Sequence, residues 1–205
     1  MAVVPLQANV IRQISSAQIV SSISSVVKEL MENAIDAGAN CIDVKLDNYG
    51  LDRIEVTDNG SGISHQNAPL VCLPSHTSKI SSLHDLERLA SYGFRGEALS
   101  AICAVAQVTI VTRSKDDELA MAYTYDSNGK VSESRMLYIQ EVFIFLSMIG
   151  NFKLFQYFKK TYMVSIFSEF FFCTQFSQFK FQLFVTVMSF ETKTQGVPPS
   201  LETNK

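Results

Sequence analysis

The sequence lacks three features that would each define a class of protein. Its 205 residues carry a net charge of only −3, so overall electrostatics do not indicate a nucleic-acid-binding protein, although an acidic average can contain a local basic strip. The N-terminal stretch MAVVPLQANVIRQISSAQ has no charged start followed by a long apolar core, so no secretory signal is predicted. The four cysteines (Cys41, Cys72, Cys103, Cys173) have no metal-binding spacing and lie among apolar neighbours, which predicts buried, reduced thiols.

Phenylalanine and glycine are unevenly distributed along the chain. Of 15 phenylalanines only Phe94 precedes residue 140, whereas seven of the nine glycines precede residue 130. This change in composition predicts an organised unit over residues 1–131 and a divergent, Phe-rich tail over residues 132–205. The tail has apolar stretches, but lysines and glutamates interrupt them, so we expect no membrane span.

Hydrophobic periodicity in the first unit alternates between helix and strand. Apolar residues recur at intervals of three and four over residues 19–34, which predicts a helix that stops near Gly38. The same spacing predicts a helix over residues 99–106. Alternating patterns predict strands at residues 41–47, 53–58, 108–113 and 120–126, the last two antiparallel, with a turn at residues 127–129. The predicted fold is α+β, with helices on one face of a mixed sheet.

The helical stretch ELMENAIDAGA places Glu29, Glu32, Asn33 and Asp36 on one arc, opposite the apolar stripe. Taken alone, such an arc is typical of a solvated helix face. However, a carboxylate one turn from an amide oxygen also suits a water-activating base beside a ligand for a hard cation such as Mg²⁺.

The stretch DNGSGI follows the second predicted strand. It is turn-forming material, yet Asp58 is in register with the core-facing Ile54 and Val56. A buried, unpaired carboxylate is costly, so we expect Asp58 to have a partner, for which the amine of a ligand is one candidate. Gly60 and Gly62 would let the backbone approach that ligand closely.

The stretch GFRGEALSAI (residues 93–102) places two glycines directly before a helix. Free N–H groups and the helix dipole both favour an anion at such a helix start, and Lys79 and Arg95 could add positive charge. A plain tight turn explains these glycines equally well. The order of residues matches neither the phosphate loop with its Gly-Lys-Ser/Thr ending nor the dinucleotide-binding turn.

Taken together and in this order, VVKELMENAIDAGA, DNGSGI, TSKI and GFRGEALSAI closely resemble the N-terminal ATPase region of the MutL mismatch-repair family. The resemblance covers about residues 11–130. The variant SSAQIVSSISSVVKEL and the stretch LDNYGLDRIEV are most similar to the first post-meiotic segregation subfamily of eukaryotes. The family has the Bergerat-type (GHKL) fold, a sandwich of helices on a mixed sheet, so this resemblance implies that fold, incomplete at its C-terminal end.

The resemblance also implies roles for individual residues. Glu29 would be the general base, Asn33 the Mg²⁺ ligand, and Asp58 the acceptor for the adenine amino group, with Gly62 beside the base. A lid would wrap the phosphates of ATP with residues 77–79 and 93–99. These lid residues are Thr77, Ser78, Lys79, Gly93, Phe94, Arg95, Gly96, Glu97, Ala98 and Leu99.

For the whole molecule, the resemblance implies a nuclear DNA mismatch-repair protein whose N-terminal dimerisation is driven by Mg-ATP. Its partners would be another MutL-family subunit in a heterodimer and mismatch-recognition proteins, with DNA as a weaker expectation and no membrane. One departure lies in VCLPSHTSK, where Pro74 and Ser75 replace a basic residue that is frequent in relatives.

Beyond residue 131 the family's continuation is not recognisable, including a second-domain lysine that reaches the terminal phosphate. ATP hydrolysis is therefore expected to be slow or absent. An alternative is a truncated, non-catalytic isoform that acts only by binding partners, its tail being translated non-coding sequence. A histidine kinase of the same superfamily is discounted, because no histidine precedes His65 to act as phosphoacceptor.

Overall fold

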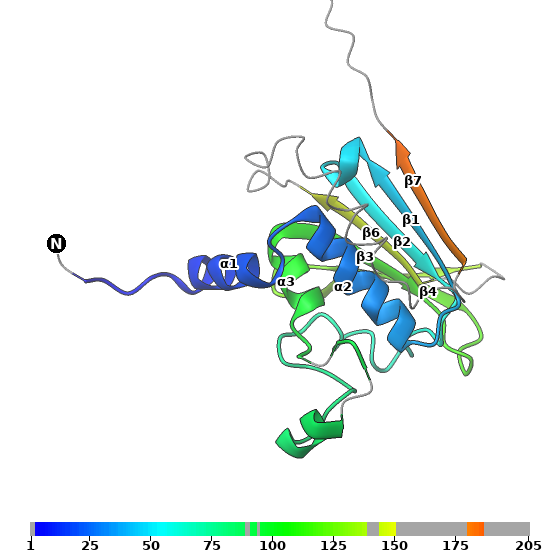
Figure 1. Ribbon diagram of the computed structural model, residues 1–205, viewed down its shortest axis with the longest axis horizontal. Helices are drawn as coiled ribbons and strands as arrows, with labels where there is room; N and C mark the ends of the chain where they lie inside the picture. The colour runs from blue at the N-terminus through cyan, green and yellow to red at the C-terminus, as the bar shows by residue number, and fades with distance from the viewer. Residues whose placement is uncertain (1–2, 89–90, 94, 139–143, 151–179, 187–205) are drawn as a thin grey trace, which may run out of the picture.

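The computed structural model describes residues 3–88, 91–93, 95–138, 144–150 and 180–186. Figure 1 shows helices gathered on one face of a single sheet, whose strands run in the order β5-β4-β3-β6-β2-β1-β7. β7 pairs with β1 in parallel and the other neighbours are antiparallel. The predicted α+β arrangement of helices on a mixed sheet is therefore confirmed.

The strands β1 (Cys41–Asp47) and β2 (Arg53–Asp58) have the predicted bounds. Their alternation places Val44 and Ile54 in the core on the helix side. On the opposite face Lys45 lies across from Glu55, with Nζ 2.9 Å from Oε1, and Arg53 also contacts Glu55 at 3.2 Å. One face of this antiparallel pair is thus hydrophobic, and the other carries ion pairs of which Lys45–Glu55 joins the two strands.

The helix α2 (Ile23–Asp36) begins later than predicted. A separate helix, α1 (Ala8–Ile19), precedes it, so Ile19 belongs to α1 and the single helix expected over residues 19–34 is corrected. The break is at Ser22, whose hydroxyl accepts from the Ser25 N–H while the Ser25 hydroxyl accepts from the Ser22 N–H. This reciprocal cap satisfies N–H groups that a continuous helix would have bonded internally. After α2 ends, Gly38 has φ of +76°, as its position predicts.

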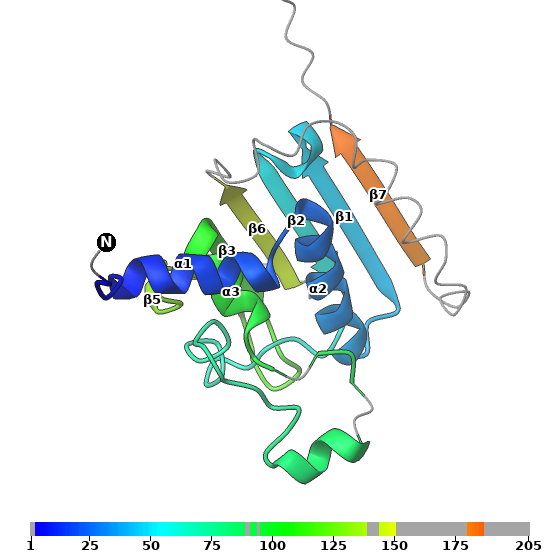
Figure 2. The same ribbon diagram turned by 60° about the vertical axis from the view of Figure 1, so that its left-hand side comes forward.

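The helix α3 (Ala98–Val105) ends one residue before Ala106, which starts β3 (Ala106–Thr112) and does not continue the helix as predicted. β4 (Ala120–Tyr125) pairs antiparallel with β3, as predicted. The predicted turn at residues 127–129 is present and joins β4 to β5 (Val131–Leu137). Figure 2 shows α1 beside α3, at the end of the sheet that β5, β4 and β3 form.

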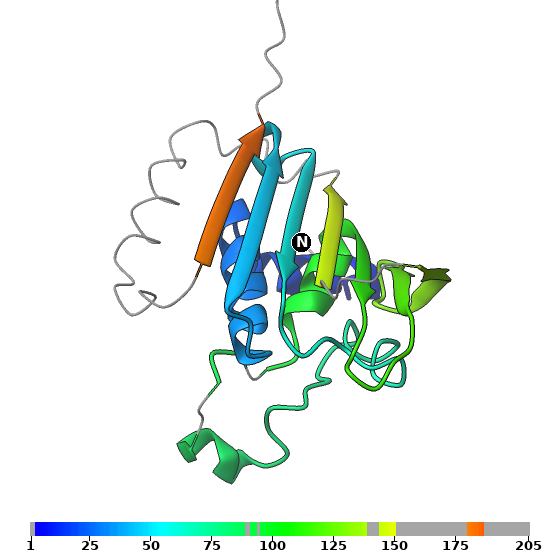
Figure 3. The same cartoon turned by 90° about the vertical axis from the view of Figure 1, so that its right-hand side faces the viewer.

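Two further strands come from beyond residue 137. β6 (Ile144–Gly150) lies between β3 and β2, and β7 (Lys180–Thr186) extends the edge at β1. Figure 3 shows β7, β1, β2 and β6 side by side in front of the helices. The domain boundary at residue 131 stays a prediction, although backbone from beyond it contributes to the same sheet.

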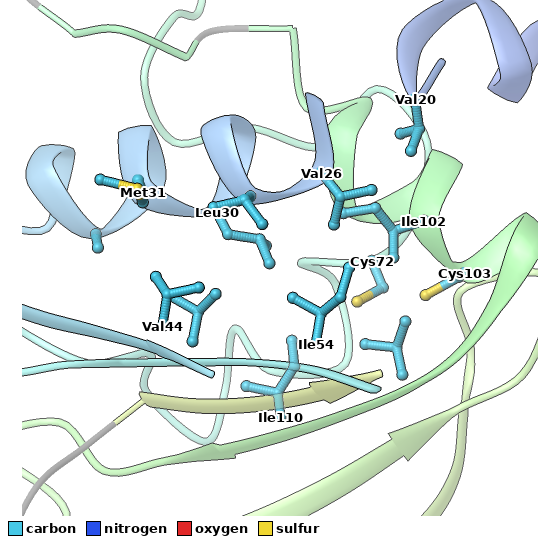
Figure 4. Packing of buried hydrophobic residues seen from close by; sticks show 14 of the residues in the cluster. Val20, Val26, Leu30, Met31, Val44, Ile54, Cys72, Ile102, Cys103 and Ile110 are labelled. Carbon is cyan, nitrogen blue, oxygen red and sulfur yellow. The ribbon is translucent and has the colours of Figure 1, made fainter. Parts of the chain in front are cut away.

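The core lies between the helices and the sheet. In Figure 4, Val26 and Leu30 of α2 and Ile102 of α3 face Ile54 and Ile110 of the strands, and all five are buried. Within the described residues, no helix is long and apolar enough to cross a membrane.

The cysteines of the described residues are free thiols. Cys72 and Cys103 are buried and their sulfur atoms face each other, whereas Cys41 is only partly buried, and Cys173 lies outside the described residues. Its hydrogen bond to Cys103 and burial both raise the pKa of Cys72, so this thiol stays protonated and unreactive.

Candidate functional site

A cavity of about 780 Å³ opens between α2, the ends of β2 and β3, and the segments that precede α3. The residues to which the resemblance gave roles in the nucleotide site line this cavity, except Phe94, which lies outside the described residues. Gly60, expected to let the backbone approach the ligand, does not line it. Glu29, Asn33 and Asp58 are thereby brought together with the lid residues 77–79, 93 and 95–99. Their roles stay predictions, but their convergence on one cavity is a property of the fold.

Asp58 ends β2 at the floor of the cavity and its side chain is buried. Its Oδ1 accepts a hydrogen bond from the Gly60 N–H at 2.8 Å. Burial raises the pKa of Asp58, and the Gly60 hydrogen bond opposes that rise without cancelling it. The described residues place no cation on this carboxylate, so it is suited to accept a hydrogen bond from a ligand N–H.

Gly62 lies where the loop after β2 crosses the end of β3. Its φ is +74°, and a Cβ there would lie 2.1 Å from the carbonyl oxygen of Arg113. One residue later, the Ile63 N–H donates to the Thr112 hydroxyl at 2.8 Å. Only glycine permits this close crossing, which holds the loop against the sheet beside Asp58.

Glu29 and Glu32 lie one turn apart on α2 and both line the cavity. Burial is the main cause that raises the pKa of Glu29, and the nearby charge of Glu32 adds to it. Lys28 pairs with Glu32 at 2.6 Å and, with Lys79 and Arg95, partly offsets the rise. A half-buried carboxylate with a raised pKa is the type of group that serves as a general base.

Asn33 and Asp36 share one cation. Lys79 Nζ donates to Asn33 Oδ1 at 2.9 Å and to Asp36 Oδ2 at 2.5 Å. Asp36 also accepts from the N–H groups of Tyr92 and Gly93, at 2.9 and 3.0 Å. Asp36 therefore joins α2 to both lid segments. The sequence places it on the polar arc of α2 but gives no sign of this contact, since its partners are distant in the chain.

The two lid segments also contact each other. Gly96 has φ of +64° and packs so closely on His76 that a Cβ would lie 2.2 Å from the His76 carbonyl oxygen. Ser75 donates to Glu97 Oε1 at 2.8 Å. The side chain of the N-cap residue Glu97 makes no capping hydrogen bond to α3, whose residues Ala98 and Leu99 line the cavity. A helix start of this kind favours an anion such as phosphate.

The described residues contain no group of three or more His, Cys, Asp or Glu side chains that could hold a metal ion. Mg²⁺ bound with a nucleotide does not require one, because it keeps several waters and takes few protein ligands beside the phosphates. The two oxygens of Asn33 and Asp36 already converge on one positive charge, the Lys79 ammonium. The residues present therefore fit a cation at this place.

A family model described as "Histidine kinase-, DNA gyrase B-, and HSP90-like ATPase" matches residues 20–145. PMS1 protein homolog 1 of Homo sapiens is 52% identical over 126 residues, which are 62% of this chain and 14% of that protein. Mismatch repair endonuclease PMS2 of Homo sapiens is 46% identical over 130 residues, or 63% of this chain and 15% of that protein. The chain thus spans about a seventh of the length of these curated relatives.

Two solved structures extend the likeness. The N-terminal domain of a DNA repair protein superposes with a TM-score of 0.67 at 27% identity, covering 89% of this chain and 55% of the other. The Aquifex aeolicus MutL ATPase domain complexed with ADP superposes with a TM-score of 0.57 at 21% identity, covering 80% of this chain and 60% of the other. This second similarity shows that the two chains share a fold. The expected Bergerat-type fold is confirmed. The chain belongs to the family of histidine kinase-, DNA gyrase B- and HSP90-like ATPases, and its relatives there are MutL-type mismatch-repair proteins.

Proposed function

We propose that the cavity binds ATP with Mg²⁺. The observation that carries this proposal is the convergence of Glu29, Asn33 and Asp58 with the lid residues on one cavity of about 780 Å³. The volume suits a nucleotide-sized ligand, and cavities of this kind commonly pair an apolar wall with a few polar groups. The ADP bound to the Aquifex aeolicus MutL ATPase domain belongs to the same class of ligand, which supports the proposal.

In this proposal Asp58 accepts a hydrogen bond from the adenine amino group, and Gly62 lies against the base. The phosphates would face the start of α3 and the lid residues 77–79, 93 and 95–99, among which the cations Lys79 and Arg95 line the cavity. Asn33 would hold the Mg²⁺ ion, which would neutralise phosphate charge. Glu29 would orient and deprotonate the attacking water. Such catalysis depends mainly on positioning and charge stabilisation.

We further propose that the chain serves DNA mismatch repair in the nucleus, as part of a protein of MutL type. Its relatives are named as mismatch-repair proteins, which supports this role. ATP would drive N-terminal dimerisation with another MutL-family subunit, and mismatch-recognition proteins and DNA would be further partners. Residues 1–131 would form the nucleotide-binding unit. Hydrolysis is proposed to be slow or absent.

Equilibrium binding of a fluorescent ATP analogue in the presence of Mg²⁺ tests the proposal. The wild-type chain should bind, and Asp58→Ala should abolish binding while the protein stays folded. Asp126→Ala is a matched control, because that carboxylate accepts from backbone N–H groups in the turn before β5, remote from the cavity. Equal affinity for all three proteins would show that the ligand does not use Asp58.

A further inference from the structure

The hydroxyl of Thr112 lies at a core-facing position of β3. The strand alternates, so that Val108, Ile110 and Thr112 share one face, and all three are buried. Two of these positions hold aliphatic side chains, and the third holds a polar group that needs a partner, because an unpaired buried hydroxyl is costly. The partner is Ile63: the Thr112 hydroxyl accepts from the Ile63 N–H at 2.8 Å and donates to the Ile63 carbonyl oxygen at 3.3 Å. These two hydrogen bonds form what we call the Thr112 clamp.

The Thr112 clamp acts on the cavity through Ile63. Gly62 and Ile63 line the cavity together with Asp58, whereas Thr112 itself does not line it. The clamp is reinforced by the preceding residue, because Gly62 packs on the backbone that follows Thr112 without room for a Cβ. At the other end of the same loop, the Gly60 N–H donates to Asp58 Oδ1 at 2.8 Å. The loop is therefore tied to the Asp58 carboxylate at one end and to β3 at the other.

We propose that Thr112 is a positioning residue for adenine recognition, whose hydroxyl sets the distance between the Gly62–Ile63 backbone and the Asp58 carboxylate. This inference rests on the proposed function, in which the base lies beside Gly62 and its amino group donates to Asp58. The clamp makes both contacts available to one base at once. Without the clamp the Ile63 N–H and carbonyl groups lose their partner and the loop shifts. A base that lies against Gly62 then no longer reaches Asp58 in hydrogen-bonding geometry, whereas the phosphates, at the start of α3, use other residues.

Thr112→Val in the full chain tests the clamp, because valine keeps the shape of threonine and removes the hydroxyl. Thr109→Val is the matched control: it is the same substitution on the same strand, and the Thr109 hydroxyl lies 3.3 Å from that of Thr124 on β4, outside the cavity lining. Thr112→Ser retains the hydroxyl. The first readout is hydrogen exchange of the Ile63 amide without nucleotide, followed by NMR. The exchange rate should rise about tenfold or more in Thr112→Val and stay near the wild-type rate in Thr109→Val and Thr112→Ser.

The second readout is the ratio of two affinities, that for ATP over that for purine riboside triphosphate, which lacks the adenine amino group. Competition with a fluorescent ATP analogue in the presence of Mg²⁺ measures both affinities. The ratio should fall about tenfold in Thr112→Val and keep its wild-type value in Thr112→Ser and Thr109→Val, because only a correctly placed acceptor discriminates against an analogue that lacks the N–H group. A general loss of stability would lower both affinities together and leave their ratio unchanged.

Exchange of the Ile63 amide at the wild-type rate in a folded Thr112→Val protein would overturn the clamp. Faster exchange with an unchanged affinity ratio would overturn the positioning role, as would an equal fall of the ratio in Thr109→Val. Thermal unfolding verifies that the variants are folded. If Thr112→Val does not fold, Thr112→Cys replaces it with the same expected results, because a thiol is a weak hydrogen-bond acceptor. Absence of ATP binding by the folded wild-type chain would instead contradict the proposed function, while hydrogen exchange still decides the clamp.

Discussion

Replacing Gly62 with alanine should damage both the fold and the nucleotide site, whereas Gly38→Ala should damage only the fold. Both glycines have positive φ, +74° and +76°, so each substitution adds backbone strain of about 1 kcal/mol. At Gly38 no atom lies within 4 Å of the new Cβ. At Gly62 the Cβ would lie 2.1 Å from the Arg113 carbonyl oxygen, so the loop must move.

That movement separates Ile63 from Thr112 and breaks their 2.8 Å hydrogen bond, which costs about 1 kcal/mol. Residual overpacking adds about 1 kcal/mol more. The free energy of unfolding should therefore fall by about 3 kcal/mol in Gly62→Ala, against about 1 kcal/mol in Gly38→Ala. With a urea m-value of about 2 kcal/mol/M, the unfolding midpoints of the two variants should differ by about 1 M.

The same shift moves the loop that follows Asp58 at the end of β2. ATP affinity should fall about tenfold or more in Gly62→Ala and stay unchanged in Gly38→Ala, which corresponds to a loss of about 1.4 kcal/mol of binding free energy. Urea denaturation followed by circular dichroism and a titration with fluorescent ATP would measure both effects. Equal midpoints for the two variants would refute the argument from the Arg113 contact.

Three further predictions follow from the buried groups. Burial raises the pKa of Asp58 above its ordinary value of 3.8, so its ionisation costs the native state stability as the pH rises through the raised pKa. Asp58→Asn should thus have a higher free energy of unfolding than wild type at pH 7, measured in urea, and this difference should vanish below about pH 3.8. The same difference in unfolding free energy at both pH values would contradict this prediction. Glu29→Gln should lower any ATP turnover about a hundredfold or more at unchanged affinity. Wild-type turnover, measured as phosphate release, should rise as the pH rises through the raised pKa of Glu29. Equal turnover by wild type and Glu29→Gln would assign the general base to another residue. Ile54→Ala, at a fully buried position, should lower the free energy of unfolding by about 3 kcal/mol. A loss below about 1 kcal/mol in urea denaturation would contradict the packing described.

The sequence was most informative where one physical signal decided the structure. Strict alternation predicted β1 and β2 with their observed bounds and placed Asp58 on the core side. The glycines before α3 were ambiguous in isolation, and only the order of the motifs distinguished a nucleotide site from a tight turn. The structure then brought these motifs to one cavity.

Other features depended on contacts that local patterns do not encode. The break between α1 and α2 rests on a Ser22–Ser25 cap, in which serine replaces the usual glutamate or glutamine, so periodicity alone continued the helix through it. The anchoring of the lid by Asp36 joins residues 43 to 57 positions apart. On a helix face, a carboxylate with such partners has the same sequence pattern as a solvated one.

The most direct test of nucleotide binding compares ATP with GTP by isothermal titration calorimetry, in the presence of Mg²⁺, on wild type and Asp58→Ala. Adenine presents an amino donor where guanine presents a carbonyl acceptor, and a buried carboxylate accepts from the first and repels the second. Wild type should bind ATP and discriminate against GTP, and Asp58→Ala should lose ATP binding. No heat of binding from the folded wild-type chain, or equal affinity for ATP and GTP, would contradict the assignment of this cavity as an adenine-nucleotide site.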